Sequence, residues 1–578
     1  MNFRKNIYTV SISAAMLVIA GCGITPQDEG LGDSSSKAMS GVVVDGYLAG
    51  ATVFVDVNEN NTLDAWENRA LTDTKGYYSY NPIDGVNYCE LPETDSKSIH
   101  CLKAPAGYDE VMVRMTGGYD LATVEPFNGT ISMKMNLTSV VIETPVAATP
   151  ITGLMSEMTA EEQAQFFVDE GLTTTIAASD FLDYDNSLTA DERKILLGLA
   201  LKAHKTADVV AVLLDEEFDQ GTLSGSTAEG GFFGVADGVP VDGSLYVYRA
   251  MVEEWRQSSG TSLSTILSSA STLESVINRA RTAIEDGPIA AYNARLSIDP
   301  ETGEIDVNEV QLVAPGAGAV ASAAHAALVV KIANTVDTVF GSGVTLDESV
   351  TGQTDGTNTL PLDITSRMRA IDAVVSLTRN GEAGSAVDNA VSLVSDGAYL
   401  DNLRLASVDM ASLKKKFIAN PGTVVAADAD FSGRKAFGEL FGSQTDSAFT
   451  PTATGASVNT EGFAGNTLAL NNTPSGQSAA DEVSVNFMGA APDATGGKLT
   501  IDATLIGGDF AKTDPDTGVP APLELTGTWE QVDPYTMMMN IEVTTGVFQP
   551  VIVKPNETGG YYFDLGGEQV SWGGGAAQ

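Results

Sequence analysis

Twelve residues of this sequence, from Asp56 to Glu67, carry side-chain types and a spacing that could hold a cation. Oxygen-bearing side chains stand at positions 1, 3, 5, 9 and 12 of the segment, and position 7 offers a backbone carbonyl. The candidate ligands are Asp56, Asn58, Asn60, Thr62, Asp64 and Glu67. Oxygen atoms at these intervals can surround one hard cation such as Ca²⁺. The segment therefore predicts a calcium site.

Position 6 of the segment departs from the usual pattern of calcium loops. Asn61 stands where such loops have Gly, and Asn tolerates a left-handed backbone better than most residues. Short β-prone runs flank the segment and predict an antiparallel β-sandwich over residues 41–146. Because strands rather than helices flank this EF-hand-like loop, Ca²⁺ would be a structural cofactor and not a switch. The alternative is an acidic turn that holds no ion.

The N-terminus has the form of a targeting signal. Basic residues at Arg4 and Lys5 precede an apolar stretch that is too short to span a membrane comfortably. Its end, Ile19-Ala20-Gly21-Cys22, resembles the lipobox of bacterial lipoproteins. The resemblance implies a signal peptide over 1–21, diacylglycerol on Cys22 and, since Gly23 follows, an outer-membrane anchor at the cell surface or the periplasmic face. Residues 22–40 then form a flexible tether.

Two cysteines remain after the signal is removed. Cys89 and Cys101 would lie in an oxidising compartment and are expected to form a disulfide around a polar loop. A metal or redox role is the weaker alternative, because their spacing is not C-x-x-C.

The first module also resembles known surface modules. The run from Ser40 to Tyr80, with its cation loop, and the run from Thr116 to Asn136 resemble the prealbumin-like, SdrD B-type or carboxypeptidase-regulatory-like modules of bacterial surface proteins. This resemblance covers about 110 of the 578 residues. It implies extracellular scaffolding or adhesion, and it brings no catalytic residues.

The rest of the chain divides into a helical and a β-rich part. Capping-box patterns at Thr159–Glu162 and Thr189–Glu192, followed by apolar residues at helical spacing, predict a helical bundle over 147–345. Residues 346–578 begin with helical stretches and continue as alternating strands between Gly, Pro and Asp turns. The predicted fold class is multidomain α+β, with an N-terminal β-sandwich, a central helical bundle and a β-rich, sandwich-like C-terminal domain.

Several weaker patterns bear on sites. Asp428 to Glu439 is a second candidate ion loop, and Asp183 to Asp191 is interpreted as a capped helix start. Asp396 to Leu405 resembles a strand of carbohydrate-binding jelly rolls. Aromatic residues of the C-terminal part could stack on sugars, although such residues in strands usually belong to the core. They are Trp529, Tyr535, Tyr561, Tyr562 and Trp572.

Charge and motifs restrict the function. With 31 Lys and Arg against 76 Asp and Glu, the net charge of −45 argues against a nucleic-acid partner and favours divalent cations. No common catalytic motif occurs, which favours a binding protein over an enzyme. The leading hypothesis is a lipid-anchored surface protein for adhesion or scaffolding, with a surface glycan or matrix protein as partner. The alternative is a polysaccharide-binding or polysaccharide-processing lipoprotein with its site in the C-terminal domain.

Overall fold

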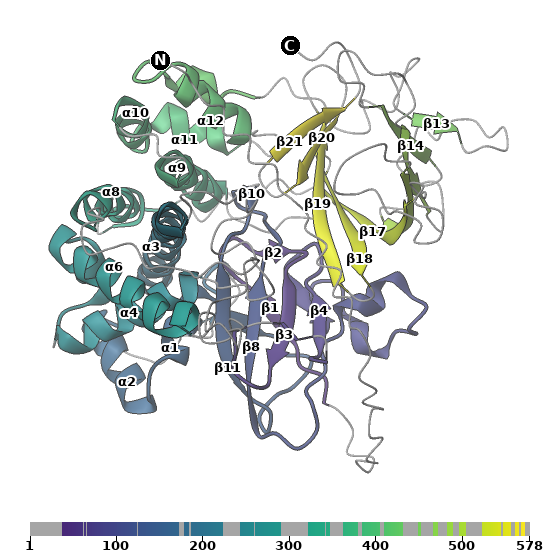
Figure 1. Cartoon of the computed structure of the whole chain (residues 1–578), viewed down its shortest axis with the longest axis horizontal. Coiled ribbons are helices and arrows are strands. Elements are labelled where there is room, and N and C mark those ends of the chain that lie inside the picture. Colours follow the sequence, from purple (N-terminus) through teal and green to yellow (C-terminus); the bar gives the residue numbers. More distant parts are fainter. Residues whose placement is uncertain are drawn as a thin grey trace, which may run out of the picture.

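The computed structural model describes most of the chain, in separate segments (Figure 1). The described residues are 37–61, 63–64, 66–123, 125–172, 179–183, 187–222, 243–258, 260–290, 322–341, 343–346, 362–379, 384–404, 410–431, 449–451, 466–471, 482–488, 496–503, 523–533, 535–544, 547–555, 561–565 and 568–572. Cys22, Thr62 and most of the second candidate ion loop lie outside them.

Small sheets make up the N-terminal part. A four-stranded antiparallel sheet contains, in order, β11 (Thr130–Asn136), β8 (Glu110–Thr116), β3 (Thr52–Asp56) and β4 (Arg69–Leu71). Opposite it, β1 (Gly41–Val43) pairs in parallel with β12 (Val146–Ala148) and antiparallel with β5 (Tyr77–Tyr78). The remaining pairs are β10 (Glu125–Pro126), β9 (Tyr119–Asp120) and β2 (Leu48–Ala49), and β6 (Tyr80–Asn81) with β7 (Val86–Asn87).

Apolar alternation explains how these sheets pack. Val43 and Tyr78 on one sheet and Val53 and Val113 on the other belong to one buried cluster. Since successive strand residues point to opposite faces, each strand contributes every second side chain to this cluster. The two short 3₁₀-helices η1 (Tyr88–Glu90) and η2 (Ser96–His100) lie between β7 and β8; Cys89 lies within η1, and Cys101 directly follows η2.

Helices cover the sheets on one side (Figure 1). The first set is α1 (Pro150–Ser156), α2 (Ala160–Asp169), α3 (Ala190–Thr222), α4 (Gly243–Gln257), α5 (Leu263–Leu267), α6 (Ala270–Ile284), a π-helical turn η3 (Glu285–Ile289) and α8 (Ser322–Phe340). The second set is α9 (Leu362–Arg379), α10 (Ser385–Leu393), α11 (Gly397–Leu403), α12 (Met410–Ala419) and the 3₁₀ turn η4 (Ala426–Ala429).

The capping boxes predicted from the sequence are confirmed. Thr159 and Glu162 exchange side-chain to backbone hydrogen bonds at the start of α2, and Thr189 and Glu192 do the same at α3. Each box satisfies two backbone N–H groups that the first helical turn leaves without partners. The capping box at Thr189 agrees with the interpretation of Asp183 to Asp191 as a capped helix start. Helix α3 packs against α4, α8 and α9.

One nine-stranded antiparallel sheet forms the described C-terminal part, with neighbouring strands consecutive in sequence. Its strands are β13 (Phe449–Pro451), β14 (Asn466–Asn471), β15 (Glu482–Phe487), β16 (Gly496–Ala503), β17 (Leu523–Asp533), β18 (Thr536–Thr544), β19 (Val547–Pro555), β20 (Tyr561–Leu565) and β21 (Glu568–Trp572). The predicted multidomain α+β fold is confirmed, with N-terminal sheets, a helical middle and a C-terminal sheet.

The three parts share buried surface. One apolar cluster includes Val42 and Tyr119 of the N-terminal sheets, Leu196 of α3 and Met538 and Ile552 of the C-terminal sheet. Gly50, with φ of +67°, lets the C-terminal sheet approach, because a Cβ there would lie 2.6 Å from the Met538 Sδ. The N-terminal sheets therefore pack against both of the other parts.

The structure contradicts one interpretation of the C-terminal half and agrees with another. The jelly-roll strand proposed for Asp396 to Leu405 is wrong, because Gly397–Leu403 is helix α11. Asp396 caps that helix by accepting hydrogen bonds from the N–H groups of Ala398 and Tyr399, and Tyr399, Leu400 and Leu403 are buried at helical spacing. Trp529 is a core residue, fully buried against Phe487.

No helix in the described segments is both long enough and apolar enough to cross a membrane.

Candidate functional site

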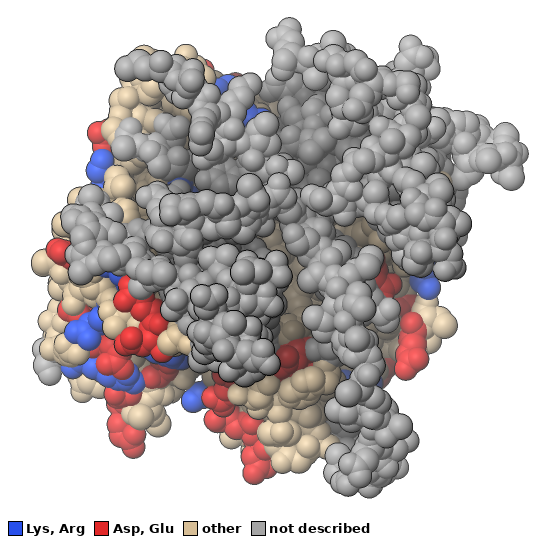
Figure 2. Space-filling model, viewed as in Figure 1, with Lys and Arg blue, Asp and Glu red and all other residues tan. Residues whose placement is uncertain are grey.

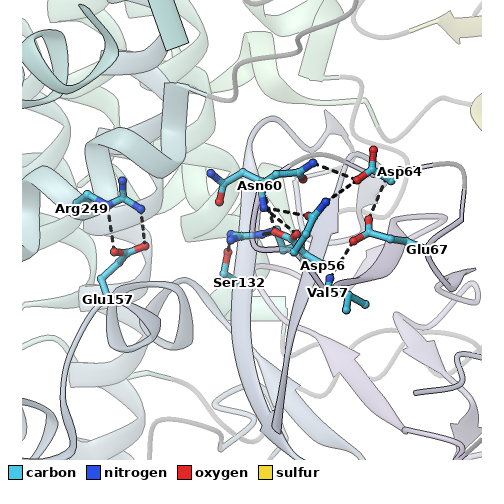
Figure 3. Close-up of polar contacts among 11 residues, drawn as sticks. Asp56, Val57, Asn60, Asp64, Glu67, Ser132, Glu157 and Arg249 are labelled. Carbon is cyan, nitrogen blue, oxygen red and sulfur yellow. Dashed lines mark hydrogen bonds and ion pairs between the residues drawn. The ribbon is translucent and has the colours of Figure 1, made fainter. Parts of the chain in front are cut away.

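The predicted cation loop connects β3 to β4 at one end of the four-stranded sheet (Figure 3). It begins at Asp56, the last residue of β3, and Glu67 lies two residues before β4. Asn61 at position 6 has φ of +67°, the left-handed conformation for which Gly is otherwise used. Glu59 also has positive φ, at +52°. The backbone thus makes the tight turn that the sequence predicted at this position.

Asp56 organises the first half of the loop. Its carboxylate is buried and accepts hydrogen bonds from the backbone N–H groups of Asn60 and Asn61, each at 3.0 Å. The Arg114 guanidinium on β8 forms an ion pair with the same carboxylate through Nε and donates from Nη1 to Ser132 Oγ at 2.8 Å (Figure 3). Asp56 therefore already has a fixed positive partner from the protein.

Asp64 gathers the side chains of the middle of the loop. Its Oδ2 accepts hydrogen bonds from the amide nitrogens of Asn58, at 2.9 Å, and Asn60, at 3.1 Å (Figure 3). Asn58 Oδ1 in turn accepts from the Asn60 N–H at 3.2 Å. Three predicted ligands thus converge, with the two amide groups presenting nitrogen to the carboxylate. Rotation of those amides would present oxygen in nearly the same place.

Glu67 closes the loop. Its two carboxylate oxygens accept hydrogen bonds from the backbone N–H groups of Val57, at 2.8 Å, and Asp64, at 3.0 Å. Burial raises the pKa of Glu67, and the neighbouring Asp56 and Asp64 carboxylates add to the rise, while the two backbone N–H groups oppose it. The interior of the loop therefore has a negative potential.

These contacts define what the loop can do chemically. The structure brings Asp56, Asn58, Asn60, Asp64 and Glu67 into one hydrogen-bonded turn, while Thr62 lies outside the described residues. No group of three His, Cys, Asp or Glu side chains in the described segments is arranged to hold a metal ion. The donor types nevertheless suit a hard cation, which would take over the carboxylate oxygens from amide and backbone donors.

The disulfide predicted from the sequence is confirmed. Cys89 and Cys101 are joined, and they close the loop that contains η1 and η2. His100 is buried and its Nδ1 lies 2.9 Å from the Leu71 carbonyl oxygen on β4. Lys97, on the same loop, pairs with Glu530 of β17 at 3.7 Å. The disulfide therefore holds an insertion that touches both the N-terminal module and the C-terminal sheet.

Sequence reasoning missed a second cluster of charged residues, between the N-terminal sheets and the helices. Asp45, Asp120, His204 and Lys205 are all buried there. Lys205 Nζ on α3 lies 2.8 Å from Asp45 Oδ2, and the His204 ring stacks on Phe127 at 4.6 Å. His204 lies on the buried face of α3. The signal that could have found the cluster is the pair His204 and Lys205, two consecutive titratable residues within the apolar stripe of α3.

Comparisons with known proteins add no relative. No protein-family model matches the chain, no curated protein matches it, and no solved structure matches it. The class that the structure itself defines is a multidomain α+β protein with a disulfide-bonded N-terminal β-module.

Proposed function

We propose that this protein is a lipid-anchored bacterial cell-surface protein that acts by binding, in adhesion or scaffolding, and that Ca²⁺ stiffens its N-terminal module. The observation that carries the proposal is the loop from Asp56 to Glu67, whose acidic and amide side chains converge on Asp64 at the tip of a β-hairpin. The lipobox-like end at Cys22 and the tether that follows supply the anchor.

The setting of the loop supports a structural ion. Its flanking strands are fixed in a four-stranded sheet, so a bound cation would hold the strand connection and neutralise the carboxylates. Trp66 beside Glu67 is 62% exposed, which leaves an aromatic side chain at the same tip for contact with a partner. Acidic side chains also cluster on the visible surface, with basic ones interspersed over the helical side (Figure 2).

Calcium is expected to raise the thermal stability of the N-terminal module. At a concentration 10 to 100 times the dissociation constant, a single site adds about 1.4–2.7 kcal/mol. Asp64→Ala and Glu67→Ala should abolish this increment because each removes a carboxylate ligand. Glu59→Ala is the matched control, since it removes an exposed charge from the same loop without removing a predicted ligand. The measurement is thermal unfolding of the mature chain in EDTA and across a calcium titration. An unchanged melt in the wild type would contradict the calcium site.

Loss of the anchor is expected to release the protein from the cell. Cys22→Ala should prevent incorporation of labelled fatty acid and move the protein from the membrane fraction to the soluble fraction, because one lipid-bearing residue supplies the attachment. Cys89→Ser with Cys101→Ser is the control, since it removes thiols without removing the lipidation site. Fatty-acid incorporation into Cys22→Ala would contradict the proposed anchor. Cells that express Cys22→Ala should attach to matrix in calcium less well than cells that express the wild type.

A cleft favours the polysaccharide alternative as a second candidate. It has a volume of about 260 Å³ and lies between the N-terminal sheets and β19. Tyr119, Phe127 and Phe548 line it together with Thr52, Thr116 and Asn128, a combination of aromatic, hydroxyl and amide groups that suits a neutral sugar. Competition of the attachment by soluble polysaccharide would favour this alternative over protein-mediated adhesion.

A further inference from the structure

Two buried carboxyl groups face each other where the N-terminal sheets meet the helices. Asp45 lies in the turn between β1 and β2, and Asp120 is the last residue of β9; their exposed fractions are 0% and 2%. The two carboxyl groups lie close enough for each to shift the pKa of the other, and each has one buried oxygen without a hydrogen-bond partner among the described residues. Gly46 permits this approach, because a Cβ at that position would lie 2.0 Å from Asp120 Oδ1. The pair is thus built into the turn.

Neighbouring groups contact one oxygen of each carboxyl group and leave the second oxygen without a donor. Asp45 Oδ2 lies 2.8 Å from Lys205 Nζ and 3.8 Å from His204 Nε2. Asp120 Oδ1 accepts hydrogen bonds from the N–H groups of Ala122 and Thr123. Within the described residues, Asp45 Oδ1 and Asp120 Oδ2 have no hydrogen-bond donor. Since two ionised carboxylates both lack a donor, a hydrogen bond between them requires a proton.

The charges around the pair also call for one proton. Every element packed against it contributes groups to the network. They are Glu125 on β10, His204, Lys205 and Asp208 on α3, Tyr248 on α4, Arg369, Asp372 and Arg379 on α9, and Lys414 on α12. With Asp45 and Asp120 there are five carboxyl groups and four permanent cations. One proton balances these charges in an environment of low polarity.

We propose that a proton shared between Asp45 and Asp120 clamps the N-terminal sheets to the helices, so that the clamp tightens as the pH falls and loosens as it rises. The clamp joins segments from both sides, because Lys205 belongs to α3 and both carboxyl groups belong to the sheets. Loss of the proton leaves two buried negative charges beside one ammonium group. The repulsion then favours separation of the sheets from α3.

The pKa values agree in direction with this arrangement. Burial, together with the Asp45 charge, raises the pKa of Asp120 to about 7. Burial opposes ionisation of Asp45 too, but the pKa of Asp45 is lowered, with the Lys205 ammonium group as its strongest opposing partner. Burial lowers the pKa of His204 to about 4, against the attraction of Asp45, so His204 is neutral at pH 7. Of the two carboxyl groups, Asp120 is therefore the one that holds the shared proton more tightly.

The sign of the pH dependence follows from the raised pKa of Asp120. The closed interface holds the proton up to about pH 7, whereas an exposed Asp loses it near its ordinary pKa of 3.8. The stabilisation is fully present below 3.8 and is lost as the pH rises through about 7. His204 has the opposite slope between about 4 and 6.5. A comparison of variants at each pH is needed to separate the two groups.

Asp120→Asn tests the clamp. The Asn amide can donate a hydrogen bond to Asp45 at every pH, because it does not ionise as the Asp120 carboxyl group does. The measurement is the hydrogen-exchange protection factor of β1, β2 and β9 in the mature chain, from about pH 5 to about pH 8. The ratio of wild-type to variant protection should rise as the pH falls, by up to about tenfold per pH unit. Asp401→Asn, which removes an exposed acid on α11, should leave the wild-type profile unchanged. A ratio that is constant with pH would overturn the proposal.

A second readout covers the case in which Asp120→Asn fails to fold. In the wild type, the hydrogen-exchange protection of β1, β2 and β9 should fall with rising pH. Strands β15 to β17 contribute no group to the network, so their protection should not show this pH dependence. Infrared difference spectra should show a protonated carboxyl that disappears as the pH rises through about 7. Parallel loss of protection in both regions, or no such carboxyl band, would contradict the shared proton.

Discussion

Replacing Arg114 with Met is expected to lower the opening free energy of the four-stranded sheet by about 3–5 kcal/mol. The Arg114 side chain is 5% exposed and its Asp56 partner is fully buried, so the variant leaves a buried carboxylate without its cation. Met fills similar space, which limits any contribution from a cavity. Native-state hydrogen exchange of β3 and β8 measures the effect locally, which is necessary because the protein has several domains.

Calcium should restore part of the stability lost in Arg114→Met. In the variant a bound cation becomes the nearest positive charge for Asp56, and so the calcium-dependent increment should exceed that of the wild type. The increment should disappear in the double variant Arg114→Met with Glu67→Ala. A calcium response that is equal in the variant and the wild type would show that Asp56 does not contact the ion.

Arg249→Met is the matched control for this loss. Arg249 forms a comparable ion pair with Glu157, at 3.1 Å, but its side chain is 47% exposed (Figure 3). A surface pair of this kind contributes about 0–1 kcal/mol. If both substitutions cost the same, burial of the Arg114 and Asp56 pair would not be the cause of its effect.

The local part of this structure could be predicted from the sequence. Helix starts at Thr159 and Thr189 depend on hydrogen bonds that span three residues, so their patterns can be read directly. Strands from Gly496 onward follow alternation and turns, and consecutive strands pair. The left-handed conformation at Asn61 likewise follows from loop spacing alone. These features need no information about distant residues.

The partners of buried charges could not be predicted. Arg114 is 58 residues from Asp56, and Lys205 is 160 residues from Asp45. Nothing local distinguishes these charged residues from solvated ones, because burial is decided by which segments pack together. The resemblance of Asp396 to Leu405 to a jelly-roll strand also gave a wrong prediction, because Asp396 caps helix α11. The helical spacing of Tyr399 and Leu403 was the signal that could have corrected it.

Replacing Lys205 with Met is expected to undock the N-terminal sheets from α3 at a cost of about 3–5 kcal/mol. Lys205 is the direct ion-pair partner of Asp45, and the two side chains are 7% and 0% exposed. Its removal leaves Asp45 beside Asp120 without an ammonium group, so both carboxyls should then be driven towards the neutral form. Protection of β1, β2 and β9 against hydrogen exchange should fall, and the fall should be smaller at acid pH.

Two further variants decide whether the uncompensated charge causes this loss. Asp45→Asn combined with Lys205→Met removes both charges and should recover most of the stability, because no buried carboxylate then lacks a partner. Lys331→Met removes a surface ion pair with Asp388, whose side chain is 64% exposed, and should cost about 0–1 kcal/mol. If the double variant is as unstable as Lys205→Met alone, packing around the Lys205 side chain and not its charge holds the sheets against α3.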